Sequence, residues 1–182
     1  DYMNLICYKN GSLAREKIKD VFGLDWDSFS KILVKSKPGN EGKIMLPYFF
    51  PEIVPLVLKP QVYRFGFDEN DISANVRGII EAQVLSMRLH SRWIAEHPQQ
   101  IYATGGASAN KEILQIIANV FGVNVKKFDI PDSAALGAAM RAAKSYYTPE
   151  EPKLSWEDVA MKFVDKHTIN IIHPNMDLHE MY

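Results

Sequence analysis

The chain has 182 residues, of which 47% are hydrophobic and 24% charged, and its formal net charge is -1. This composition is ordinary for a globular protein with room for one sizeable α/β domain. The balanced charge argues against a nucleic-acid-binding or membrane-binding surface. The longest apolar stretch, residues 44–58, contains Pro47, Pro51 and Pro55, which excludes a membrane-spanning helix there.

The chain begins with an apolar segment, residues 2–8, that is typical of a β-strand. It holds the single cysteine, Cys7, which excludes an internal disulfide and favours a reducing, cytoplasmic location. We expect this thiol to be buried and inert, because its neighbours are apolar. No signal-peptide pattern appears at the start. The first residue is not Met and the chain opens directly in this strand-like segment, so we expect it to be a fragment of a longer protein, with a removed tag or a processed end as the open alternative.

Two helices are predicted next. Ser12 is expected to cap a helix over residues 13–22, and Asp25 is expected to cap a second helix over residues 26–34. The histidines show no metal-ligand spacing with one another or with the cysteine, so no zinc site is predicted.

The middle of the chain contains one short strand and one long helix. Residues 44–50 favour a strand, and the proline-rich residues 51–60 are expected to be extended or irregular. A long helix is predicted over residues 73–97, with apolar residues around most of its circumference. Such a helix is covered by other elements on more than one side.

The run Tyr102-Ala-Thr-Gly-Gly-Ala-Ser-Ala-Asn110 carries the clearest functional signal. It reads as the end of a short buried strand, Gln100–Thr104, that breaks at Gly105 and Gly106 and enters a helix near Asn110. Glycine has no Cβ, so a ligand can come close to the backbone. A helix N-terminus presents free N–H groups that suit a nucleotide or phosphate. A tight turn without any ligand stays open, because the chain contains neither G-x-G-x-x-G nor a phosphate loop.

The helix that begins near Asn110 is expected to end at Phe121, with Gly122 in the C′ position. A strand over residues 123–128 follows. An alanine-rich helix over residues 133–146 comes next, and its small side chains are expected to pack closely on the sheet.

The last part of the chain has weaker signals. A Ser-x-x-Asp capping box at Ser155 and Asp158 predicts a short helix that extends to Val164. Residues 169–182 show little periodicity and are expected to form a tail.

The order of these elements indicates an α/β sandwich. A dinucleotide-binding sheet stays open as an alternative, because Asp129 lies about 20 residues beyond the glycines, where such a site holds an acidic residue. The glycine spacing argues against this alternative.

Four segments, in this order, resemble the C-terminal half of the FGGY carbohydrate kinases, closest to the branch that phosphorylates xylulose. They are Tyr8–Glu16, Trp26–Ser30, Ala103–Gln115 and Asp132–Ala139. The resemblance covers residues 2–147. It implies the ribonuclease-H-like fold that is shared with actin, hexokinase and the 70-kDa heat-shock proteins, with a mixed sheet flanked by helices.

The resemblance also implies site residues. Gly105 and Gly106 match glycines that line the adenosine pocket of the family, and Asn110 matches the residue that reaches the adenine. Trp26 matches a tryptophan on the nucleotide side, although a role as the core anchor of its own helix stays open. Gly11 and Ser12 match a strand–helix turn near the same cleft.

The activity that the resemblance implies is transfer of the γ-phosphoryl group of ATP to a ketopentose, with D-xylulose favoured and Mg²⁺ as the accompanying ion. In the family, the catalytic Asp and the sugar-binding residues belong to segments N-terminal to those matched here. No catalytic residue is therefore assigned in this chain, and the chain alone is expected to be inactive. The sugar is expected to bind against an N-terminal domain.

The same resemblance assigns residues 1–147 to the nucleotide-binding domain and residues 148–182 to a linker, a short helix and a tail. A non-catalytic nucleotide-binding or regulatory module with this fold is the alternative function. Whether the chain forms a homo-oligomer stays open.

Overall fold

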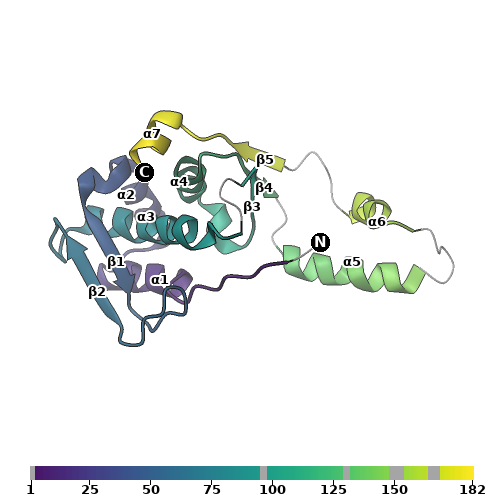
Figure 1. The fold of residues 1–182 in the computed structure, drawn as a ribbon, viewed down its shortest axis with the longest axis horizontal. Coiled ribbons are helices and arrows are strands. Elements are labelled where there is room, and N and C mark those ends of the chain that lie inside the picture. The colour runs from purple at the N-terminus through teal and green to yellow at the C-terminus, as the bar shows by residue number, and fades with distance from the viewer. Residues whose placement is uncertain (1–2, 95–97, 129–131, 148–153, 164–168) are drawn as a thin grey trace.

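The computed structural model describes residues 3–94, 98–128, 132–147, 154–163 and 169–182. Figure 1 shows a main body, from which one pair of helices, α5 and α6, extends to one side. The helices and strands are α1 (Ser12–Val21), α2 (Trp26–Lys35), the 3-10 helix η1 (Pro38–Gly42), β1 (Ile44–Tyr48), β2 (Gln61–Phe65), α3 (Ile72–Ser91), β3 (Ile101–Ala103), the 3-10 helix η2 (Gly106–Ala109), α4 (Lys111–Phe121), β4 (Val125–Phe128), α5 (Ser133–Tyr147), α6 (Trp156–Phe163), β5 (Ile169–Ile172) and α7 (Met176–Met181).

The described strands form two sheets. β1 and β2 make an antiparallel pair, and β4 lies at the centre of a three-stranded mixed sheet, parallel to β3 and antiparallel to β5. The register aligns Ile101, Val125 and Ile172, which pack with Leu114 and Ala118 of α4. A mixed sheet with helices beside it agrees with the expected α/β class.

The long helix α3 is the centre of the main body. Asp71 caps it, because the Asp71 carboxylate accepts a hydrogen bond from the Ala74 N–H at 3.0 Å. Residues 74–81 are all buried, since α1, α2, α4 and β1 pack around this helix. The prediction of a helix covered on more than one side is confirmed. The helix ends at Ser91, earlier than expected.

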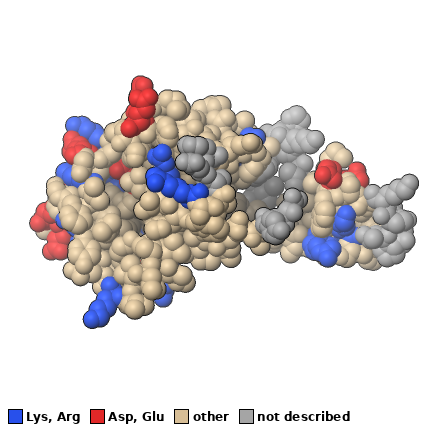
Figure 2. Space-filling view, in the orientation of Figure 1, with Lys and Arg blue, Asp and Glu red and all other residues tan. Residues whose placement is uncertain are grey.

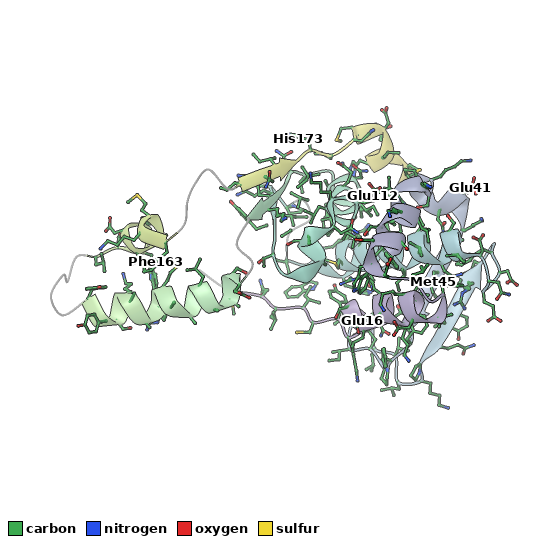
Figure 3. The ribbon with its side chains drawn as sticks, turned by 180° about the vertical axis from the view of Figure 1, so that it is seen from behind. Glu16, Glu41, Met45, Glu112, Phe163 and His173 are labelled. Carbon is green, nitrogen blue, oxygen red and sulfur yellow. The ribbon has the colours of Figure 1, made fainter. Side chains whose placement is uncertain are left out.

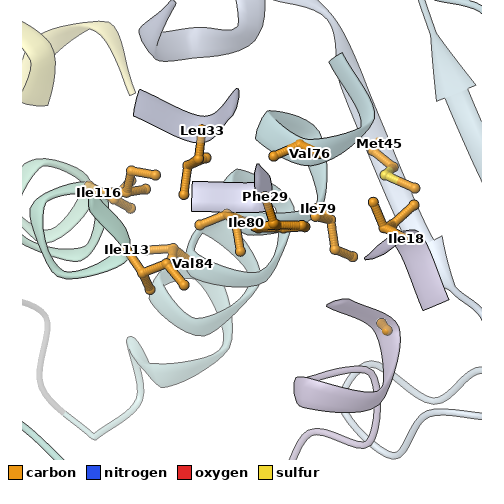
Figure 4. Packing of buried hydrophobic residues seen from close by; sticks show 12 residues of the cluster. Ile18, Phe29, Leu33, Met45, Val76, Ile79, Ile80, Val84, Ile113 and Ile116 are labelled. Carbon is orange, nitrogen blue, oxygen red and sulfur yellow. The ribbon is translucent and has the colours of Figure 1, made fainter. Parts of the chain in front are cut away.

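The main apolar core joins α3 to its neighbours. Figure 4 shows Phe29 of α2, Ile80 of α3 and Ile113 of α4 within one cluster, and Ile18 of α1 and Met45 of β1 belong to it as well. Burial of apolar area, worth about 25 cal/mol per Å², therefore holds together elements that lie far apart in the sequence.

A polar network is also buried beside this core. The Arg77 guanidinium, 1% exposed, donates from Nε to Glu81 at 2.6 Å and from Nη2 to the Tyr182 hydroxyl at 3.1 Å. The Tyr182 hydroxyl in turn donates to Glu81 at 2.5 Å, and Arg77 Nη1 donates to Glu112 at 3.2 Å. The last residue of the chain is thus tied to the central helix.

The predicted strand over residues 2–8 is wrong for the described residues 3–8, which form no strand. A strand needs a neighbour to bind its backbone N–H and C=O groups, and no other described segment pairs with this one. Cys7, expected to be buried, is exposed. Met3 and Leu5 are 90% and 77% exposed, so apolar side chains alone do not bury this segment.

The alanine-rich helix α5 forms as expected, but its predicted packing on the sheet is wrong. None of its described residues is buried, and it packs instead against α6, where Arg141 and Lys144 lie over the Trp156 ring. Figure 3 shows Phe163 of α6 far from the main body. Alanine permits close packing but drives it weakly, because a methyl group buries little apolar area.

The capping box at the start of α6 is confirmed. The Ser155 hydroxyl accepts from the Asp158 N–H at 3.1 Å, and the Asp158 carboxylate accepts from the Ser155 N–H at 2.9 Å. The predicted end of this helix at Val164 and the acidic Asp129 lie outside the described residues.

Two strands, β2 and β5, and one α-helix, α7, were not predicted. β5 pairs with β4 in the same sheet, and α7 packs on α4, so residues 169–182 contact the main body closely. The division of the chain after residue 147 stays a prediction.

The surface carries charges of both signs. Figure 2 shows Lys, Arg, Asp and Glu side chains scattered over one face, with large uncharged areas between them. Among the helices in the described parts of the chain, none has the length and apolar character to cross a membrane.

Candidate functional site

The Gly-Gly turn begins the candidate site. After β3, Gly105 adopts φ +83 and ψ -177, a conformation that is open to glycine and costly for other residues. The Ser108 hydroxyl donates to the Gly105 carbonyl at 2.7 Å, which holds the turn closed over one turn of 3-10 helix. A Cβ at Gly106 would meet no heavy atom within 4 Å, so its backbone borders open space.

This turn forms one wall of a cleft of about 500 Å³. Side chains of α1 and α2 form the other walls, and Figure 3 shows Glu16 on α1. The lining residues are Ser12, Arg15, Glu16, Trp26, Asp27, Phe29, Ser30, Gly106, Ala107, Ala109, Asn110 and Ile113. The structure therefore brings together four residues predicted for the site: Ser12, Trp26, Gly106 and Asn110.

Two predicted residues are not among those that line this cleft. Gly105 lies directly before Gly106 and shapes the turn. Gly11 lines a second cavity of about 430 Å³, where its carbonyl accepts a hydrogen bond from Gln83 Nε2 at 2.8 Å. The two cavities share Arg15, Ala107 and Ile113.

The prediction that Ser12 caps α1 is wrong. The helix begins at Ser12 itself, and Gly11 occupies the cap position without a side-chain hydrogen bond. Ser12 therefore does not cap the helix, and it is among the residues that line the cleft.

Trp26 is 47% exposed, which argues against a role as the core anchor of α2. Phe29 fills that role, since it is 1% exposed. The Trp26 and Phe29 rings meet edge to face, with 5.6 Å between their centroids and 66° between their planes. Asp25 caps this helix as predicted by accepting from the Ser28 N–H at 2.7 Å, and hydrogen bonds from Ser28 hold the pKa of Asp25 below its usual value.

Asn110 both caps α4 and contacts α2. Its Oδ1 accepts from the N–H groups of Glu112 and Ile113, at 3.0 and 3.2 Å. Its Nδ2 donates to the Ser30 hydroxyl oxygen at 2.8 Å. This contact joins the two walls of the cleft that carry Trp26 and Gly106.

Ser30 and Arg15 are cleft residues that our sequence reasoning missed. Ser30 lies four residues after Trp26, which places both on one helix face, and this spacing was the available signal. Arg15 donates from Nη1 to Gln83 at 2.8 Å. Burial lowers the pKa of Arg15 from its usual value, and the nearby Glu16 carboxylate opposes this effect.

The residues of the cleft do not fit a metal ion by themselves. In the part of the chain that the structure describes, no group of three or more His, Cys, Asp and Glu side chains is placed to hold one. Glu16 and Asp27 are the carboxylates among the cleft residues. What the cleft offers is an indole ring, open backbone at Gly106, amide and hydroxyl groups, and one guanidinium.

A sequence model of the C-terminal domain of the FGGY family of carbohydrate kinases matches residues 23–146. Xylulose kinase from Rattus norvegicus is 39% identical to this chain over 150 residues, which cover 78% of this chain and 28% of that protein. Xylulose kinase 2 from Arabidopsis thaliana is 39% identical over 164 residues, which cover 80% of this chain and 29% of that protein. The chain thus spans less than a third of the length of these relatives.

Solved structures show the same fold. Ligand-bound xylulose kinase from Lactobacillus acidophilus matches 96% of this chain and 36% of its own, with a TM-score of 0.79 and 20% identity. Glycerol kinase from Plasmodium falciparum, solved with ADP, matches 93% of this chain and 33% of its own, with a TM-score of 0.67 and 19% identity. The architecture expected from the sequence, the ribonuclease-H-like fold of these kinases, is confirmed.

Proposed function

The chain belongs to the FGGY family of carbohydrate kinases, and from this membership we propose that its cleft binds the adenine nucleotide of a sugar kinase. The whole protein would transfer the γ-phosphoryl group of ATP to a ketopentose, D-xylulose, and release D-xylulose 5-phosphate. The names of the relatives at 39% identity support this choice of sugar.

One observation carries the nucleotide part of the proposal. The exposed indole of Trp26, the open backbone of Gly106 and the Asn110 side chain that caps α4 all line a single cleft of about 500 Å³, although the indole belongs to α2 and the other two groups to a segment far from it in the sequence. An indole face stacks on a purine, open glycine backbone lets the ligand come close, and an amide binds polar atoms of the base. The volume lies within the usual range for ligand pockets, roughly 300–1,000 Å³.

Phosphoryl transfer depends on positioning of the reactants and on neutralisation of the phosphate charge. We propose that this chain contributes the first of these by holding the nucleotide. Mg²⁺ would neutralise phosphate charge and would arrive with the nucleotide, since the described cleft residues form no metal site. The base and the sugar contacts would belong to parts of the family fold beyond the segments matched here.

The test is calorimetric titration of the chain with Mg·ADP. Loss of aromatic stacking on a base costs about 1–3 kcal/mol, so Trp26→Ala should weaken binding by about tenfold. Trp156→Ala is the matched control, because Trp156 is 46% exposed but lies on α6 and outside the cleft. A folded chain that does not bind Mg·ADP, or that loses affinity equally in both variants, would contradict the proposal.

A second measurement concerns catalysis. With ATP, Mg²⁺ and D-xylulose, the chain alone should form no sugar phosphate, as read by mass spectrometry of the product mixture. Turnover that needs about tenfold more ATP in Trp26→Ala would show that this chain contains the complete catalytic site.

A further inference from the structure

Three neighbouring groups determine the orientation of the Asn110 side-chain amide. Two backbone N–H groups, those of Glu112 and Ile113, point at Oδ1. An amide oxygen has two lone pairs, so the helix cap uses the full acceptor capacity of this side chain. The opposite orientation would place the amide N–H₂ against two N–H donors.

Ser30 fixes the other end of the amide. The Ser30 hydroxyl donates its single proton to the Trp26 carbonyl at 2.7 Å, so its oxygen is left as an acceptor for Asn110 Nδ2 at 2.8 Å. The bonds thus run in one direction, from Asn110 to Ser30 and from Ser30 to Trp26. A side-chain amide nitrogen carries two hydrogens, and Ser30 is the described partner of only one of them.

From this arrangement we infer that Asn110 presents a hydrogen-bond donor, and no acceptor, to the base in the cleft, and that Ser30 is the residue that positions it. The inference rests on the proposed function, since it concerns how the same cleft reads its nucleotide. A single N–H pairs with a ring nitrogen of the purine. The 6-amino group of adenine is itself a donor, so Asn110 does not read it.

The first test is Asn110→Asp. Aspartate is as good an N-cap as asparagine, so α4 keeps its cap while the N–H donor is lost. Calorimetry should show Mg·ADP binding weakened by about tenfold, since the lost hydrogen bond is replaced by two facing lone pairs. Ala109→Asp adds the same charge at a neighbouring, exposed cleft residue and controls for repulsion of the phosphates.

The second test identifies the ring nitrogen. The 1-deaza, 3-deaza and 7-deaza analogues of ADP each lack one acceptor. One of the three should bind the unsubstituted chain several-fold more weakly than ADP, and this difference should vanish in Asn110→Asp.

Ser30 is tested by the ratio of the affinity for ADP to the affinity for that deaza analogue. Ser30→Ala should reduce the discrimination between ADP and that deaza analogue by about threefold, and Ser30→Thr, which keeps the hydroxyl, should restore it. A purely structural role of Ser30 would change the melting temperature and leave this ratio unaltered.

The outcomes separate the two proposals. If the unsubstituted chain does not bind Mg·ADP, the proposed function itself fails. If it binds, and Asn110→Asp keeps the affinity of Ala109→Asp, then Asn110 acts as an acceptor or not at all, and only the donor assignment is overturned.

Discussion

At the scale of single residues, two separate features of the structure require glycine at position 122. It ends α4 in the left-handed conformation, with φ +68, as its C′ position predicts. A Cβ at this position would also lie 2.7 Å from the His179 ring. The imidazole of α7 therefore packs on a site that only glycine leaves open.

Gly122→Ala should consequently destabilise the chain by more than the backbone conformation alone requires. Left-handed backbone costs a non-glycine residue about 1–2 kcal/mol, and displacement of His179 should add to it. Urea unfolding followed by circular dichroism measures the loss. Gly23→Ala is the control, because Gly23 has φ +61 and no heavy atom within 4 Å of the added Cβ; equal losses in the two variants would contradict the packing argument.

Tyr182 provides a pH-dependent prediction. Burial raises the pKa of its hydroxyl to about 12, and the hydrogen bond to Glu81 acts in the same direction. The folded state therefore retains this proton at pH values where the unfolded state, with the ordinary value of 10.0, releases it. The contribution to stability is complete below pH 10 and is lost as the pH rises toward 12.

Tyr182→Phe should lower the free energy of unfolding at neutral pH by about 1–3 kcal/mol, since a hydrogen bond to a charged group is lost. The difference from the unsubstituted chain should shrink between pH 10 and 12. Guanidinium unfolding at a series of pH values measures it. Tyr63→Phe, which changes an exposed hydroxyl, should show neither effect.

At the scale of elements, helix ends followed local sequence signals well. Asp25, Asn110 and Ser155 cap their helices with the side-chain bonds expected of these residue types. Such bonds span three residues or fewer, so the local sequence contains the information. The prediction for Ser12 was wrong because a serine that follows a glycine can also be the first residue of the helix, with the glycine in the cap position.

The cap of α3 is testable in the same terms. Asp71→Ala should lower the free energy of unfolding by about 1 kcal/mol, whereas Asp71→Asn should keep the cap and lose only the partly exposed ion pair with Lys43 at 3.1 Å, worth about 0–1 kcal/mol. Thermal unfolding at neutral pH compares the two. The hydrogen bond from the Ala74 N–H lowers the pKa of Asp71. The contribution of the Asp71 carboxylate to stability is therefore present at pH values above the usual pKa of aspartate, and it is lost as the pH falls through the lowered pKa. An Asn variant as unstable as the Ala variant would contradict the assignment of Asp71 as a helix cap.

At the scale of the whole molecule, the described chain contains a main body and a separate pair of helices. Ile80, 1% exposed, belongs to the core of the main body, while Val159, 2% exposed, is the buried residue of α6. Figure 1 shows α5 and α6 beside one another and away from the main core.

Substitutions at Ile80 and at Val159 should act independently of one another. Ile80→Ala should destabilise the main body by about 2–5 kcal/mol. Val159→Ala should speed amide exchange in α5 and α6 but leave the main body within about 0.5 kcal/mol, since distant sites act additively. Hydrogen exchange read by mass spectrometry resolves both regions. A drop in protection of α3 in Val159→Ala would show that the helix pair supports the main body.

The sequence by itself determined the central helix, the Gly-Gly turn, most helix caps and the family. These features depend on periodicity, on backbone conformations that glycine alone adopts readily, and on short-range hydrogen bonds. Only the tertiary structure decided that residues 3–8 pair with no other described segment, that α5 packs on α6 and not on the sheet, that β5 and α7 return to the main body, and that Ser30 meets Asn110. Each of these depends on which distant segment lies opposite, because burial and pairing are properties of two surfaces together and local sequence describes only one of them.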